Sequence, residues 1–223
     1  MNEANIEKIY KSEDYFVLNN IENLKIQMRF FIPFHQKDEN KNKLAVISHP
    51  HPLFGGTMQN NVVRAVRDAF IKFGISTVTF NFRGVGKSTG SFSNGIGEQN
   101  DLKIVINFLL EKGYSSIILA GYSFGAVISL AVSKEYNLID SIILISYPFG
   151  FIKNISPNYE LKISKLFIIG TQDDFVNLDL FKREYAKFTE PKRFSIISNS
   201  DHFYIGFEKK IEEIILQFLA EKK

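Results

Sequence analysis

A serine flanked by two glycines, between an apolar run and a helix-like stretch, is the feature that most constrains the fold of this chain. Residues 117–120 (Ile-Ile-Leu-Ala) are typical of a buried strand and residues 126–132 of a helix, so residues 121–125 (Gly-Tyr-Ser-Phe-Gly) form the corner between them. A sharp strand-to-helix turn strains the corner residue and crowds the positions two before and two after it, where glycine is needed. We therefore expect Ser123 to hold its hydroxyl clear of the sheet and the Phe124 N–H to meet an oxyanion.

Acidic residues and a histidine follow the serine in an informative order. Residues 164–169 are typical of a buried strand, and the turn-rich segment after them contains Asp173 and Asp174. His202 lies in a polar loop after the strand-like residues 194–197. Each candidate thus leaves the carboxyl end of a strand, the edge at which open α/β sheets carry their chemistry. The order serine, acid, histidine is that of a catalytic triad built on a strand-to-helix elbow, with either aspartate open as the acid.

Strand-like and helix-like segments alternate along the chain at short loop distances. Because such alternation produces a mostly parallel sheet with helices on both faces, we predict an α/β fold. The predicted strands are residues 15–18, 24–32, 44–47, 75–80, 117–120, 139–145, 164–169 and 194–197, with a turn at Asn19 and Asn20. The predicted helices are residues 62–73, 101–110 and 126–132, a helix around 178–181, and a final helix over 207–219.

Composition excludes several classes of function. With 223 residues, 45% apolar content and no apolar stretch long enough to cross a bilayer, we expect one globular domain over residues 1–223 and no membrane partner. A formal net charge of +3, with basic residues dispersed among acidic ones, argues against a nucleic-acid partner. The absence of cysteine and of a basic-then-apolar start favours a cytoplasmic protein. We expect no cofactor, and either a monomer or a homodimer.

Two further segments, taken with the serine elbow, carry a resemblance to a known family. They are residues 49–58 (His-Pro-His-Pro-Leu-Phe-Gly-Gly-Thr-Met) and residues 81–88 (Asn-Phe-Arg-Gly-Val-Gly-Lys-Ser). Together with Asp173 and His202, these residues resemble the α/β-hydrolase superfamily, and within it the small lidless bacterial hydrolases that have an HPHPxxGG segment. The resemblance covers nearly the whole chain. It implies an α/β-hydrolase fold without a cap domain.

The same resemblance implies a serine hydrolase of the esterase or thioesterase type, acting on small soluble esters or thioesters. Its triad would be Ser123, Asp173 and His202, because the family's acid stands two residues before a hydrophobic pair, here Phe175 and Val176. In this mechanism His202 takes the proton of Ser123, Asp173 orients the imidazole, and water resolves the acyl-enzyme.

The oxyanion donors implied by the resemblance are two backbone N–H groups. One belongs to Phe124, and the other to His51, two residues after the histidine that ends the third strand. Pro50 stands where a glycine is more usual, and Pro52 has no N–H to offer, so the N–H of Leu53 is an alternative donor.

Substrate contacts are expected from the same loops. We predict that Leu53, Tyr147 and Phe149 contact the substrate, although aromatic side chains at these positions could equally fill core. The connection over residues 147–163 is too short to fold a cap with a core of its own. The site is therefore predicted to stay open, to prefer short acyl groups and to show no activation at lipid interfaces.

Individual residues also admit simpler interpretations. Ser123 could be a helix N-cap, His202 a solvated loop residue, and the two aspartates caps of the next helix. His49 and His51 could chelate zinc, but no third or fourth ligand stands nearby in the sequence, and no metal is predicted.

Two other classes of protein need consideration. Residues 84–89 (Gly-Val-Gly-Lys-Ser-Thr) resemble the end of a phosphate-binding P-loop, which would make the chain a nucleotide hydrolase. Asn81 occupies the position of the first P-loop glycine, however, and an unhelical run follows Lys87, so this alternative fails. The other alternative is a hydrolase scaffold used only for binding, against which the ordered triad argues.

Overall fold

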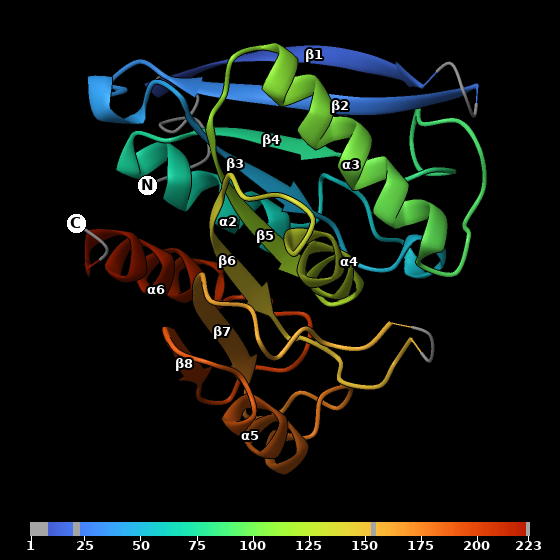
Figure 1. Ribbon diagram of the computed structural model, residues 1–223. Helices are drawn as coiled ribbons and strands as arrows, with labels where there is room; N and C mark the ends of the chain where they lie inside the picture. Colours follow the sequence, from blue (N-terminus) through green and yellow to red (C-terminus); the bar gives the residue numbers. More distant parts are fainter. Residues whose placement is uncertain (1–8, 20–22, 153–154, 222–223) are drawn as a thin grey trace.

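In the part of the chain that the structure describes, the core is an eight-stranded sheet in the order β1-β2-β4-β3-β5-β6-β7-β8 (Figure 1). The computed structural model describes residues 9–19, 23–152 and 155–221. β1 and β2 are antiparallel, β2 is antiparallel to β4, and the remaining pairs are parallel, which confirms the predicted mostly parallel sheet. The strands are β1 (Tyr10–Asn19), β2 (Leu24–Pro33), β3 (Lys43–Ser48), β4 (Ser76–Phe80), β5 (Ser116–Tyr122), β6 (Ile139–Ile145), β7 (Ser164–Gly170) and β8 (Lys192–Ile197).

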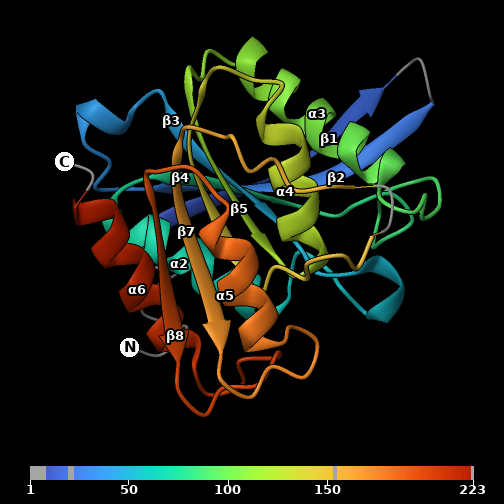
Figure 2. The ribbon, with the colours of Figure 1, turned by 60° about the horizontal axis from the view of Figure 1, so that its bottom comes forward.

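Helices cover both faces of the sheet (Figures 1 and 2). α2 and α6 pack on one face, and α3, α4 and α5 on the other, so each face has its own hydrophobic cluster. The helices are α2 (Asn61–Phe73), α3 (Ile96–Glu111), α4 (Phe124–Ser133), α5 (Leu178–Ala186) and α6 (Glu208–Glu221), with short 3-10 turns at η2 (Asp38–Asn40) and η3 (Pro52–Phe54). No helix within the described ranges is long and apolar enough to cross a membrane.

β3 shows why the central strands are apolar on both sides. Leu44 and Val46 enter the cluster under α3 and α4, whereas Ala45 and Ile47 enter the cluster under α2 and α6. Side chains alternate across a strand, and both faces here are covered, so every position of the strand interior must be apolar. Burying each large side chain contributes roughly 1.5–3 kcal/mol, which makes the sheet a rigid support for the loops at its edge.

Two elements, β1 and α3, begin well before the start that their patterns predicted. β1 begins at Tyr10 rather than residue 15, because backbone pairing with β2 continues through polar residues that an edge strand can expose to water. α3 begins at Ile96 rather than residue 101, because the Glu98 carboxylate accepts hydrogen bonds from the N–H groups of Ser93 and Gly95 and caps a first turn that lacks apolar periodicity. Of the predicted first turn, Asn20 lies outside the described residues.

Arg83 joins the loop after β4 to a helix beside the sheet. The guanidinium contacts the buried carboxylate of Asp101 on α3, with Nε at 2.9 Å and Nη2 at 2.8 Å from Oδ1. The Arg83 N–H also donates to Oδ2 of the same carboxylate. This pair ties the loop after β4 to α3. Because β3, β5, β6, β7 and β8 are parallel, the loops at their carboxyl ends meet at one edge of the sheet.

Candidate active site

The serine elbow is a strained corner between β5 and α4. Ser123 has φ of +54°, in the left-handed region that side chains rarely adopt, and its N–H donates to the Ile145 carbonyl at 2.8 Å. A Cβ on Gly121 would overlap the carbonyl of Gly125, and a Cβ on Gly125 would overlap the carbonyl of Ser48 at the end of β3. Both glycines are therefore required by the close approach of strand, helix and neighbouring strand, and the serine hydroxyl is held at the edge of the sheet.

Asp173 follows β7 and is fully buried and fully hydrogen-bonded. Its Oδ1 accepts the N–H groups of Phe175 at 3.0 Å and Val176 at 2.9 Å, and its Oδ2 accepts the Ser146 hydroxyl at 2.6 Å. Burial on its own raises the pKa of Asp173, but hydrogen bonds from His202 and Ser146 outweigh it and hold the pKa of this carboxyl below its ordinary value. Asp174, in contrast, is exposed. The structure thus brings Asp173, and not its neighbour, to the histidine.

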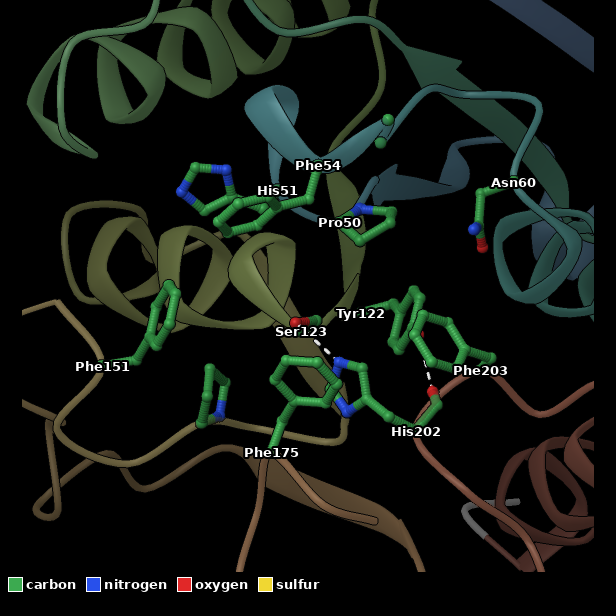
Figure 3. Close-up of a pocket in the computed structure, with 13 residues that line it drawn as sticks. Pro50, His51, Phe54, Asn60, Tyr122, Ser123, Phe151, Phe175, His202 and Phe203 are labelled. Atoms are coloured by element: carbon green, nitrogen blue, oxygen red, sulfur yellow. Dashed lines mark hydrogen bonds between the residues drawn. The ribbon is translucent and has the colours of Figure 1, made fainter.

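His202 lies between the aspartate and the serine (Figure 3). Its Nδ1 is 2.9 Å from each oxygen of Asp173, and its Nε2 is 3.1 Å from the Ser123 hydroxyl oxygen. Because a carboxylate only accepts, Nδ1 carries the proton and Nε2 is free to accept the proton of Ser123. The Tyr122 hydroxyl donates to the His202 carbonyl at 2.6 Å and holds the histidine loop against β5.

The series of hydrogen bonds from Ser123 through His202 to Asp173 continues behind Asp173 through two hydroxyl groups. The Ser146 hydroxyl oxygen is 2.6 Å from Oδ2 of Asp173 and 2.6 Å from the Tyr204 hydroxyl oxygen. Ser146 has one hydroxyl hydrogen, which the carboxylate takes, so Tyr204 must donate to Ser146. Both residues have positive φ, +45° and +56°, and both are buried. Sequence reasoning assigned neither of them a role, although Ser146 directly follows β6, the strand next to β5.

His49 is a buried clamp under the loop after β3. Its Nε2 accepts the N–H of Phe82 at 3.0 Å, and its Nδ1 lies 2.6 Å from the Pro50 carbonyl, to which it donates. Burial lowers the pKa of His49 to about 4, so the ring stays neutral at physiological pH. Within the described ranges, no group of three His, Asp or Glu side chains is placed to hold a metal ion.

The hydrogen bonds of the loop after β3 show which of its N–H groups already have an acceptor. The Leu53 N–H donates to the His51 ring at 3.2 Å, and the N–H groups of Phe54 and Gly56 donate to the His51 carbonyl. Because the Leu53 N–H is already hydrogen-bonded to the His51 ring, it is disfavoured as the alternative oxyanion donor. In the described part of the chain, the backbone N–H groups of His51 and Phe124 donate to no protein acceptor.

A cavity of about 440 Å³ opens at the serine (Figure 3). No Asp, Glu, Lys or Arg is among the described residues that line it. The lining consists of Pro50, His51, Phe54, Gly55, Gly56, Asn60, Tyr122, Ser123, Pro148, Phe151, Phe175, His202 and Phe203. The cavity is thus mostly apolar, and the polar side chains in its lining are His51, Asn60, Tyr122, Ser123 and His202.

The predicted substrate contacts Leu53, Tyr147 and Phe149 do not line this cavity, which corrects their assignment. Tyr147 is buried in the core, and Phe149 packs on it with ring centroids 4.7 Å apart. Leu53 is 66% exposed and lies outside the lining. The short-range pattern could not show which way each loop turns, so it missed Phe54, Phe175 and Phe203, which take these places.

Comparisons with known proteins agree with this fold. A homologue from Rickettsia prowazekii, the uncharacterized protein RP471, is 30% identical over 179 residues, 76% of this chain and 74% of that protein. An alpha-beta serine hydrolase homologue from Coxiella burnetii is 32% identical, with a TM-score of 0.85 over 93% of this chain and 97% of that chain. XC6422 from Xanthomonas campestris, described as an a/b serine hydrolase without lid, is 25% identical with a TM-score of 0.82, over 95% and 94% of the two chains.

No family model matches the chain. The level of identity to the Coxiella structure, over nearly the whole of both chains, nevertheless shows the class: this chain belongs to the α/β-hydrolase superfamily. Its structural neighbours include a hydrolase without a lid, and in this chain the connection from β6 to β7 contains no helix or strand in the residues that the structure describes.

Proposed function

We propose that this protein is a serine hydrolase that cleaves small soluble esters or thioesters through an acyl-enzyme. The observation that carries the proposal is the continuous hydrogen-bond chain from Asp173 through His202 to Ser123, which ends at an apolar cavity. A binding scaffold has no need of an acid, a base and a hydroxyl in this order and geometry.

The chemistry follows from the proton positions. Nε2 of His202 takes the Ser123 proton as the serine oxygen attacks the carbonyl carbon, and Asp173 stabilises the imidazolium through Nδ1–H. The negative charge that develops on the carbonyl oxygen meets the free N–H groups of Phe124 and His51. His202 then protonates the leaving oxygen or sulfur, and a water molecule activated by the same nitrogen releases the acid.

Labelling by a fluorophosphonate probe, combined with hydrolysis of p-nitrophenyl acetate, tests the proposal. Ser123→Ala should abolish labelling and lower kcat on the order of a thousandfold or more, because among the described residues Ser123 is the hydroxyl that is hydrogen-bonded to the His202 imidazole. Ser115→Ala is the matched control, since this exposed serine lies just before the opposite end of β5. Wild-type protein that neither labels nor hydrolyses the ester would favour the binding scaffold instead.

A further inference from the structure

Exposed phenylalanine rings surround the catalytic serine. Among the cavity residues, Phe54 is 78% exposed, Phe151 52%, Phe175 61% and Phe203 53%. Rings of this size bury 150–250 Å² when covered, so leaving several of them around one cavity marks a surface that a ligand covers. Because no charged side chain is among the lining residues in the described chain, that ligand is uncharged where it contacts the rings.

The rings form two walls with Ser123 between them (Figure 3). The first wall, which we call the acyl wall, consists of His51, Phe54 and Phe151, with ring centroids 4.6 and 5.9 Å from that of His51. The second, the alcohol wall, consists of Phe175 and Phe203 around His202, with centroids 4.7 and 5.9 Å from that of the histidine.

Chemistry assigns one part of an ester to each wall. When the tetrahedral intermediate collapses, the C–O bond to the alcohol breaks, and Nε2 of His202 gives its proton to the departing oxygen. The alcohol must therefore lie within hydrogen-bond reach of His202, beside Phe175 and Phe203. The acyl carbonyl oxygen points to the N–H groups of Phe124 and His51, and the acyl group takes the remaining side of the tetrahedral carbon, along Phe54 and Phe151.

We infer that the alcohol wall selects esters whose alcohol carries an uncharged aromatic ring, such as a benzyl group, while the acyl wall takes the acyl group. This inference rests on the proposed serine hydrolase function. Phe175 and Phe203 meet edge to face, with centroids 6.1 Å apart and an interplanar angle of 86°. A third ring placed against this pair gains aromatic contacts that a saturated ring of the same size does not.

Acetate esters of four alcohols test the inference: benzyl, cyclohexylmethyl, 4-carboxybenzyl and ethyl alcohol. All four form the same acetyl-enzyme, so kcat/KM compares how well the alcohol side is bound during acylation. We expect the benzyl ester to exceed the cyclohexylmethyl ester by about two- to tenfold, the value of one aromatic pair. The 4-carboxybenzyl ester should fall below the benzyl ester, because its charge enters an apolar wall.

Phe175→Leu and Phe203→Leu should each bring the benzyl-to-cyclohexylmethyl ratio toward one. The ratio is taken within each variant, so a general effect on the adjacent His202 cancels. Phe54→Leu, the same change in an exposed ring on the acyl wall, is the matched control and should leave the ratio unchanged.

A ratio near one in the wild-type enzyme, or an equal fall in Phe54→Leu, would overturn the assignment of the walls while leaving the hydrolase function in place. Wild-type protein that hydrolyses none of the four esters and takes no fluorophosphonate label would overturn the proposed function, and this inference with it.

Discussion

The two sides of the cavity differ in how their residues are held. Behind His202, the carboxylate of Asp173 and the hydroxyls of Ser146 and Tyr204 are buried, and every one has a hydrogen-bond partner. At the mouth, Phe54 and Phe175 expose more than half of their side chains to solvent. Leaving a buried polar group without its partner lowers the free energy of unfolding by about 1–3 kcal/mol, whereas replacing an exposed ring changes it little. Substitutions behind the site should therefore change chemistry or stability, and substitutions at its mouth should change selectivity alone.

The largest expected effect separates two adjacent carboxylates. Asp173→Asn should lower kcat on the order of a thousandfold or more, because the amide cannot stabilise the imidazolium and can reverse the tautomer of His202. Asp174→Asn, the matched control in an exposed position, should stay within about twofold of wild type. Steady-state kinetics on p-nitrophenyl acetate measures both. The opposite ranking would move the role of the acid to Asp174.

His49 should make the stability of the protein depend on pH. Above about pH 6.5 its ring is neutral in both the folded and the unfolded chain. Below that pH His49 binds a proton in the unfolded chain. In the folded chain, where the pKa of His49 is about 4, the ring stays neutral until the pH approaches 4. The free energy of unfolding should therefore fall as the pH falls from 6.5 to 4, by on the order of 3 kcal/mol from this group.

Urea denaturation of the wild type and of His49→Gln at several pH values isolates that contribution. Gln keeps an acceptor for the Phe82 N–H but has no titrating group, and all other groups titrate alike in both proteins. The variant should lose less stability between pH 6.5 and 4. If the free energy of unfolding changes with pH equally in the two proteins, the folded protein protonates His49 as readily as the unfolded chain does.

The hydroxyl chain behind Asp173 should have a smaller effect on catalysis, seen in kcat rather than in KM. Ser146→Gly removes a donor to Oδ2 of the carboxylate and relieves a positive φ, so the backbone is not strained by the change. We expect kcat to fall about tenfold with KM nearly unchanged, the size of one hydrogen bond to a charged group.

Tyr204→Phe tests whether the two hydroxyls act as one unit. It should lower kcat less than Ser146→Gly does, since Ser146 can still donate to Asp173. In the Ser146→Gly background it should have almost no further effect on kcat, because its hydroxyl reaches the carboxylate only through Ser146. Additive effects in the double variant would argue against a connected chain.

The smallest expected effect is on stability at the cavity mouth. Phe54→Ala should change the free energy of unfolding by less than about 0.5 kcal/mol, because that side chain is 78% exposed. Phe80→Ala, at a fully buried position in β4, should cost about 3–5 kcal/mol. Urea denaturation compares the two. A loss of stability in Phe54→Ala similar to that in Phe80→Ala would remove the contrast between the two sides of the site.

Local pattern was sufficient to place the strands, the helices and the serine elbow. Apolar runs and helical spacing are patterns of a few neighbouring residues. Glycine is required at 121 and 125 because a Cβ at either position would overlap the backbone at the turn. The carboxyl end of a strand is a property of chain direction, so the positions of Asp173 and His202 at the same edge of the sheet followed from the predicted parallel order.

Tertiary packing decided what lies around those residues. Ser146 and Tyr204 are 58 positions apart in the chain, and they meet because β6 lies next to β7 and the backbone of Ser200, at the start of the histidine loop, packs against Gly170 at the end of β7. The walls of the cavity depend on which way the irregular loops turn, and loops have no periodicity to read. For this reason Tyr147 and Phe149 pack inward, while Phe54, Phe175 and Phe203 face the cavity.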